Sequence, residues 1–183
     1  MRLEGLFISK DCTPCPGPPL WYAQPHMRTA ILLALSTLAA TTSGLSQELT
    51  TKKSLNLAVA KKIAAAAEAE ARKNNWNVVI TILDDGANIL YLQRMDGTQI
   101  GSVDVAIAKA ASAVKFKRPT KVFEDAVKGG RQAILKLPGA LPVEGGETIV
   151  VDGAVLGAIG VSGVQSDQDG VIARAGLAAV AAK

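Results

Sequence analysis

The sequence predicts an α+β domain built on one mainly antiparallel sheet. Two pairs of β-rich segments each surround an Asp-Gly turn, Asp85-Gly86 in one pair and Asp152-Gly153 in the other. Such turns between apolar runs are a strong signal for a β-hairpin. Segments with helical spacing of apolar residues precede, separate and follow the two hairpins. Hairpins flanked by helices favour an α+β domain over a doubly wound sheet, whose parallel strands need helical crossovers.

The expected elements follow from local patterns along the chain. Ser54 can cap the first helix, and Pro119 ends the second, after which Thr120 can cap a third, weaker helix. Gly129-Gly130 is an expected break in that third helix. Within residues 166–169, Asp167 and Asp169 favour the start of a last helix, because they complement the positive end of its dipole. The expected order is helix 54–75, strands 76–83 and 89–92, helices 102–116 and 122–135, strands 148–151 and 154–162, and helix 170–182.

The last predicted strand lies in the glycine-rich segment 152–163, around which the domain is organised. Gly157, Gly160 and Gly163 interrupt it, and glycine within a strand marks a bend, a bulge or a close approach of another group. Two interpretations stay open. The strand is curved and carries a helix packed close against it, or its bare backbone forms one wall of a ligand site.

Residues 27–46 have the layout of a secretory signal peptide, with a positive charge, an apolar run and small residues at the end. We therefore expect export to the periplasm or the extracellular space, with residues 47–183 as a single mature domain. Residues 1–26 precede the signal, so we interpret them as an extension outside the natural protein, which would start at Met27. The apolar run is shorter than the about 20 residues of a membrane helix, so no stable membrane insertion is expected after cleavage.

The composition of the expected mature chain excludes several kinds of chemistry. Cys12, Cys15 and His26 are the only cysteines and histidine, and all precede Met27. Disulfides, Ser-His or Cys-His catalysis, ordinary zinc sites and a histidine-ligated haem are therefore not expected within the subunit. From Gln47 onward, 17 Lys and Arg residues stand against 14 Asp and Glu residues. Because this excess is small and aromatic residues are scarce, nucleic-acid binding is not expected.

Several short motifs, in the same order along residues 54–182, together resemble one protein family. They are Leu83-Asp84-Asp85-Gly86, Arg94-Met95-Asp96-Gly97, Ala106 to Ala110, Arg118-Pro119-Thr120, Gly145-Gly146 and the segment 152–163. The chain resembles the GlcG/HbpS family, also called haem-degrading-domain-like, which includes the C-terminal domain of PduO proteins. The resemblance implies a profilin-like or PAS-like fold with a five-stranded antiparallel sheet. It also implies homo-oligomers, often octamers, and, for HbpS-type members, binding of haem and iron.

The first functional hypothesis is therefore a secreted, oligomeric haem- or tetrapyrrole-binding protein, with haem as its cofactor and partner. Lys109, Lys117 or Arg118 would pair with the propionates. Because the expected mature chain has no histidine, the resemblance points to the Thr120 hydroxyl as the axial iron ligand, with Tyr91, Met95, Lys109 or water as alternatives. The ligand-binding candidates are Lys109, Phe116, Arg118, Thr120, Gly157 and Gly160.

Two of the polar candidates also have a purely structural interpretation. Thr120 can simply cap the helix that follows Pro119, without any role in ligand binding. Lys109 can lay its stem along an apolar surface and keep its ammonium in water. Both interpretations stay open beside the haem hypothesis.

Two other functions are compatible with the sequence. The first is an enzyme or accessory protein acting on a small anionic metabolite, suggested by the glycolate association of GlcG. Its acid-base candidates are Asp84, Asp85, Asp96 and Lys109, although aspartate in a hairpin turn is also favoured by turn chemistry alone. The second is a structural or sensory oligomer whose haem binding is incidental. No catalytic residue is assigned, and catalysis is not the favoured expectation.

Overall fold

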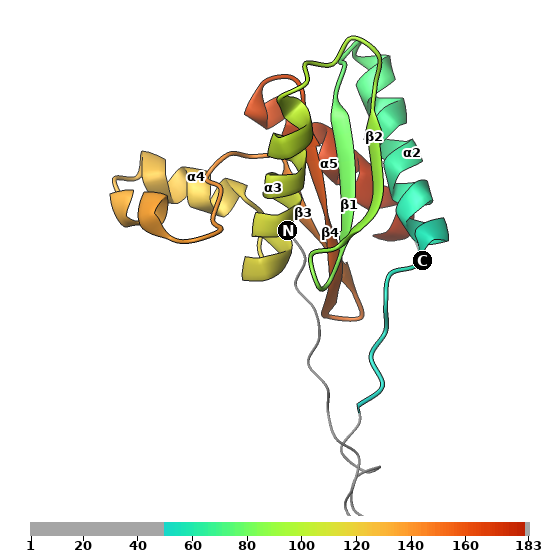
Figure 1. The fold of residues 1–183 in the computed structure, drawn as a ribbon, viewed down its shortest axis with the longest axis horizontal. Coiled ribbons are helices and arrows are strands. Elements are labelled where there is room, and N and C mark those ends of the chain that lie inside the picture. Colours follow the sequence, from blue (N-terminus) through green and yellow to red (C-terminus); the bar gives the residue numbers. More distant parts are fainter. Residues whose placement is uncertain (1–49, 182–183) are drawn as a thin grey trace, which may run out of the picture. The chain divides into compact units, whose positions relative to one another are not determined.

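The computed structural model describes residues 50–181, so the expected signal peptide and upstream extension lie outside the described residues. From Thr51 onward the described chain forms one compact unit. Its four strands are β1 (Val79–Asp84), β2 (Ile89–Arg94), β3 (Gly146–Val151) and β4 (Ala154–Ser162). They form one antiparallel sheet in the order β2-β1-β4-β3 (Figure 1). The α+β prediction is confirmed.

The five-stranded sheet implied by the resemblance is wrong for the part of the chain that the structure describes. The two hairpins supply four strands, and the other described segments are helices, turns or loops. The second hairpin has the expected two-residue turn, since Asp152 and Gly153 both have positive φ values, of 50° and 78°. That geometry is typical of a type I′ turn, whose twist matches the twist of the flanking strands.

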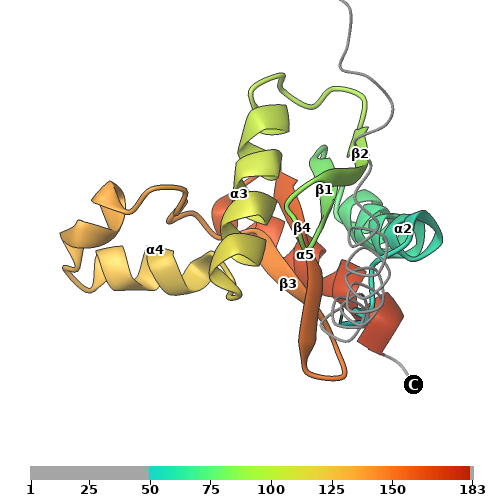
Figure 2. The ribbon, with the colours of Figure 1, turned by 60° about the horizontal axis from the view of Figure 1, so that its bottom comes forward.

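Helices cover both faces of the sheet. One face carries α3 (Ser102–Phe116), which lies against β1, β4 and β3. The other face carries α2 (Leu57–Lys73) and α5 (Ser166–Ala181), which also pack against each other (Figure 2). Within the described residues, no helix is long and apolar enough to cross a bilayer.

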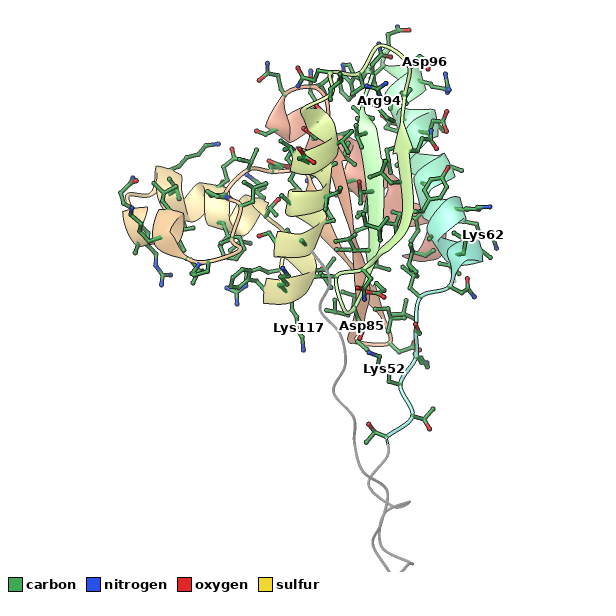
Figure 3. All side chains as sticks on the ribbon, in the orientation of Figure 1. Lys52, Lys62, Asp85, Arg94, Asp96 and Lys117 are labelled. Atoms are coloured by element: carbon green, nitrogen blue, oxygen red, sulfur yellow. The ribbon has the colours of Figure 1, made fainter. Side chains whose placement is uncertain are left out.

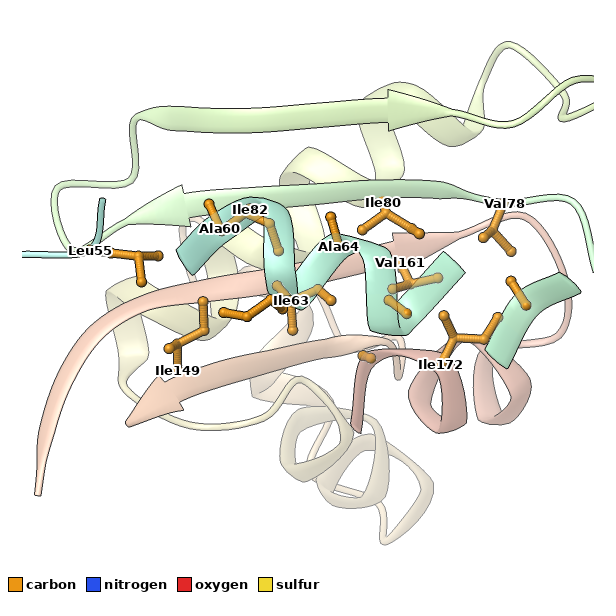
Figure 4. Close-up of a cluster of buried hydrophobic side chains, with 14 of the residues drawn as sticks. Leu55, Ala60, Ile63, Ala64, Val78, Ile80, Ile82, Ile149, Val161 and Ile172 are labelled. Atoms are coloured by element: carbon orange, nitrogen blue, oxygen red, sulfur yellow. The ribbon is translucent and has the colours of Figure 1, made fainter. Parts of the chain in front are cut away.

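The larger hydrophobic core lies between the sheet and the pair α2 and α5 (Figure 4). The alanine face of α2 and isoleucines of β1 and β4 form much of it, as the helical and alternating apolar patterns predict. A smaller cluster under α3 contains Leu83, Ala110, Ala113, Val114 and Ala158. The alanines of this cluster and Gly160 of β4 allow the α3 backbone to approach the sheet closely.

Helix α2 begins later than the sequence analysis predicts. Its cap is Asn56, whose side-chain oxygen accepts a hydrogen bond from the backbone N–H of Val59 at 2.9 Å. The prediction that Ser54 caps this helix is therefore wrong. Leu55, just before the cap, is buried in the core instead of lying in the first turn of the helix.

The predicted helix over residues 122–135 is two short elements, α4 (Lys121–Lys128) and the 3₁₀ helix η1 (Gln132–Lys136). The predicted break at Gly129-Gly130 is confirmed, since Gly130 has a φ of +93°, a conformation that glycine adopts easily. The two elements project away from the sheet beyond α3 (Figure 1). Each buries a single side chain, Phe123 in α4 and Ile134 in η1.

Candidate functional site

Lys109, from the middle of α3, lies in the interior and not at the surface. Its ammonium donates a hydrogen bond to the carboxylate of Asp169 at 2.7 Å and another to the carbonyl oxygen of Val161 at 3.0 Å. The Lys109 and Asp169 side chains are only 1% and 2% exposed. The interpretation of Lys109 as a lysine with its ammonium in water is therefore wrong. The side chain enters the interior because Asp169, in the first turn of α5, supplies a charge partner there.

Burial also perturbs the titration of the Asp169 carboxyl. Burial raises the pKa of Asp169 to about 6, although the Lys109 ammonium and the backbone N–H groups of Val164 and Gly163 act in the opposite direction. Desolvation disfavours a charged carboxylate, whereas a nearby cation favours it. The balance places the titration of this carboxyl close to neutral pH.

Thr120, at the start of α4, is fully buried. Its hydroxyl accepts a hydrogen bond from the backbone N–H of Gly146 at 2.9 Å and faces the Gly146 carbonyl oxygen at 3.4 Å. Although Thr120 occupies the cap position of α4, its side chain makes no capping hydrogen bond. The prediction of a capping side chain is therefore wrong, because the hydroxyl binds the start of β3 instead.

Gly145 and Gly146 bring Lys109 and Thr120 together. A Cβ atom on Gly145 would lie 2.8 Å from the Lys109 Nζ, and one on Gly146 would lie 2.4 Å from the Lys109 carbonyl oxygen and 2.7 Å from the Thr120 Cγ2. Both glycines are therefore required by close packing. We call the group Lys109, Thr120, Gly145, Gly146 and Asp169 the polar centre.

A second set of charges adjoins the polar centre. Arg174 of α5 donates to Glu144 at 2.8 Å and to Glu147 at 3.3 Å, and Lys121 lies 3.6 Å from Glu144. Burial raises the pKa of Glu147, although Arg174 opposes that change. The sequence analysis missed the roles of Glu144 and Asp169, and the neighbouring Gly145-Gly146 is the one local signal that could have drawn attention to Glu144.

Phe116 and Arg118 lie apart from the polar centre, where α3 turns into α4. The Phe116 and Phe123 rings meet edge to face with centroids 5.2 Å apart, and the Arg118 guanidinium lies 5.8 Å from the centroid of Phe123. Lys117, with a φ of +52°, ends α3, and its side chain extends away from the fold (Figure 3). We call Phe116, Lys117, Arg118 and Phe123 the aromatic corner. It offers two exposed cations and the half-buried Phe116 ring to a flat, anionic ligand, whereas Phe123 is only 4% exposed.

Gly157 and Gly160 lie inside the domain, and both are buried. A Cβ atom on Gly160 would lie 2.0 Å from the carbonyl oxygen of Ala106 in α3, and one on Gly157 would lie 2.2 Å from that of Leu83. The interpretation of a strand with a helix packed close against it is confirmed. The prediction of a bare wall is wrong, because α3 and β1 occupy the space that a ligand would need.

The predicted acid-base residues do not form one site. Asp84 serves the hairpin turn, where its carboxylate accepts hydrogen bonds from the backbone N–H groups of Asn88 and Gly86, and these bonds lower its pKa. Asp85 pairs with Lys52 at this end of the sheet, and Asp96 lies at the opposite end (Figure 3). Lys109 is buried in the polar centre. The arrangement therefore provides no shared acid-base centre from these four residues.

A pocket of about 330 Å³ lies beside the two hairpin turns. It is lined by Thr51, Lys52, Lys53, Asp85, Val151, Asp152, Ala154, Val155 and Leu156. None of the six ligand-binding candidates lines this pocket. Among residues 50–181, no group of three or more His, Cys, Asp or Glu residues could hold a metal ion.

Comparison with known proteins gives consistent matches over this domain. Residues 55–178 match the family described as "Haem degrading protein HbpS-like". Protein GlcG of Escherichia coli K12 is 42% identical over 112 residues, which cover 61% of this chain and 84% of that protein.

Two solved structures are similar in fold and sequence. A double mutant of HbpS from Streptomyces reticuli is 34% identical with a TM-score of 0.67, covering 76% of this chain and 96% of that chain. A structure described as a PduOC–haem complex is 27% identical with a TM-score of 0.63, covering 69% of this chain and 95% of that chain.

Proposed function

Because the chain belongs to the HbpS-like family of haem-binding and haem-degrading-like domains, we propose that it is an exported haem-binding protein that works as a homo-oligomer. The observation that carries the proposal is the similarity of most of the described domain to a protein whose structure is described as a haem complex. The signal-peptide layout of residues 27–46 supports export. The resemblance to the GlcG/HbpS family supports an oligomer.

The aromatic corner is the part of this subunit that suits a porphyrin. A porphyrin presents a flat apolar ring and two carboxylates, and binding sites for such ligands combine apolar surface with a few well-placed charges. The half-buried Phe116 ring provides aromatic surface, Phe123 is buried, and the exposed Lys117 and Arg118 can pair with carboxylates. Haem, when bound, would supply an iron centre, and the aromatic corner would hold and orient the ring.

The predicted iron ligands fit haem less well than the aromatic corner does. Thr120 is fully buried and hydrogen-bonded to Gly146, and Lys109 is paired with Asp169. Residues 50–181 contain neither histidine nor cysteine. The proposal therefore concerns binding of haem and assigns no chemical step at the iron.

A haemin titration of the purified chain tests the binding proposal. We expect a Soret shift that saturates near one haemin per subunit. The double variant K117Q/R118Q should weaken binding by about tenfold or more, since charge-assisted pairs contribute on the order of 1.5–3 kcal/mol each. The matched control K62Q removes a similar charge from α2, away from the aromatic corner (Figure 3), and should leave binding unchanged. No Soret shift at stoichiometric haemin, or an equal loss in K62Q, would contradict the proposal.

Export and assembly need their own measurements. Expression of the full chain in a bacterial host, followed by fractionation and mass spectrometry, should find mature protein beginning near Gln47 outside the cytoplasm. A peptide from residues 1–26 in the exported material would contradict the expected processing. Size-exclusion chromatography with light scattering should give a mass several times that of the subunit, and a monomeric mass would contradict the oligomer.

A further inference from the structure

The hydroxyl of Thr120 is already committed to the fold. It accepts the hydrogen bond of the Gly146 N–H at 2.9 Å and is fully buried, with the start of β3 against it. Because the side chain is fully buried, the hydroxyl could reach an iron atom only by moving away from Gly146. That movement would leave the Gly146 N–H unpaired in the interior, and an unpaired buried donor is costly. Thr120, the residue that the resemblance suggests as axial ligand, therefore makes a structural hydrogen bond in this subunit.

The other candidate ligands are also engaged. Withdrawal of Lys109 would leave the carboxylate of Asp169 buried without its cation. Met95 is 7% exposed and belongs to the larger hydrophobic core. The hydroxyl of Tyr91 donates to the side chain of Gln93 at 2.8 Å. Lys109 and Met95 could reach a metal only by giving up contacts that stabilise the domain, and Tyr91 is held by its hydrogen bond to Gln93.

The groups that stay accessible recognise a different part of the ligand. Lys117 and Arg118 are exposed at the aromatic corner, and Arg118 already lies close to the face of the Phe123 ring. Ammonium and guanidinium groups recognise carboxylates, and the half-buried Phe116 ring, unlike the buried Phe123, can contact a flat π system. Neither kind of contact depends on a metal at the centre of the ring.

We propose that this chain recognises the tetrapyrrole ring and its carboxylates, not the iron, so that its ligand class is dicarboxylate tetrapyrroles with or without a metal. This inference rests on the proposed haem binding. It narrows that function by placing the binding energy at the aromatic corner and outside the iron coordination sphere.

The test compares three ligands on the full purified chain: haemin, metal-free protoporphyrin IX and haemin dimethyl ester, whose carboxylates are blocked. We expect haemin and protoporphyrin IX to bind with dissociation constants within about threefold of each other. The ester should bind about tenfold more weakly or worse, since it has lost its charge-assisted pairs. K117Q/R118Q should weaken haemin and protoporphyrin IX by the same factor.

Variants of the donors provide the second arm. Met95→Leu conserves volume in the core, and Thr120→Ser keeps the hydroxyl whereas Thr120→Val removes it. With the fold verified by circular dichroism, the Soret maximum and the electron paramagnetic resonance spectrum of bound ferric haem should be the same in all three variants as in the parent. If Thr120→Val does not fold, Met95→Leu and the ligand comparison still decide the question.

The outcomes separate the two proposals. Haemin binding that is more than about thirtyfold tighter than protoporphyrin IX binding, or a changed haem spectrum in a folded donor variant, would overturn metal-independent recognition while leaving haem binding in place. Equal binding of haemin and protoporphyrin IX would support metal-independent recognition. Binding of neither ring would refute the proposed function, and the inference would fall with it.

Discussion

The Lys109 ammonium and the Asp169 carboxylate, 60 residues apart in the chain, lie 2.7 Å from each other with almost no exposure to solvent. Lys109 belongs to α3 on one face of the sheet, and Asp169 belongs to α5 on the other. The same ammonium also binds the carbonyl oxygen of Val161 in β4. One side chain thus joins both helical layers to the sheet between them.

Removing one partner of this pair should destabilise the domain strongly. Lys109→Met leaves the Asp169 carboxylate buried without its cation, and such changes lower the free energy of unfolding by about 3–5 kcal/mol. The double variant K109M/D169L removes both charges and should recover much of that loss. Urea denaturation measures both, with Lys62→Met as an exposed control. A loss in Lys109→Met no larger than in the control would contradict a structural role for the pair.

The raised pKa of Asp169 predicts a pH dependence with a definite sign. In the folded chain the pKa is about 6, whereas the unfolded value is about 3.9. Between these values the folded state binds more protons than the unfolded state, so this group makes the free energy of unfolding rise as the pH falls from 7 toward 4. The measurement is the difference in unfolding free energy between the parent and Asp169→Asn across that range.

As the pH falls from 7 toward 4, the parent should become more stable relative to Asp169→Asn. Glu147, whose pKa is also raised by burial, titrates in both proteins and cancels from the difference. Carbon NMR of the Asp169 carboxyl should give a midpoint near 6. A midpoint below the ordinary aspartate value would show that Lys109 outweighs burial, and it would reverse the expected sign.

Close packing of α3 on β4 predicts that Gly160 tolerates no side chain. A Cβ atom would lie 2.0 Å from the Ala106 carbonyl oxygen, so Gly160→Ala should lower the unfolding free energy by about 1–3 kcal/mol or more. Gly101→Ala is the matched control, because no atom lies within 4 Å of its Cβ position, and it should change stability by less than about 1 kcal/mol. Equal thermal stability of the two variants would contradict the close approach.

The hydroxyl of Thr81 makes no hydrogen bond within the described residues. It is fully buried in β1, and its Oγ1 has no hydrogen-bond partner among the described residues. Because an unsatisfied buried hydroxyl is unfavourable, Thr81→Val should raise the unfolding free energy by about 1 kcal/mol. Thr120→Val is the contrasting variant, since it removes a hydroxyl that binds Gly146, and it should lower stability. A loss in both variants would indicate a partner for the Thr81 hydroxyl.

Local chemistry made the hairpins and the close helix packing predictable. Asp152-Gly153 has the residues that a type I′ turn requires, and the spacing of Gly157 and Gly160 signals a close approach to the strand. Lys109 was misjudged because a lysine among alanines has the same pattern whether its ammonium reaches water or a carboxylate. Only the fold brings Asp169 to it, and the same holds for Thr120, whose partner Gly146 lies 26 residues away.

The projection formed by α4 and η1 has a consequence for how this fold can change. Its root is fixed where Thr120 binds Gly146 and Lys121 lies near Glu144, but beyond the root each of its two short helices buries one side chain. Insertions or exchanges in its outer part would therefore alter the surface chemistry of the molecule without disturbing the sheet. The scaffold can acquire new recognition properties on an appendage while its interior stays the same.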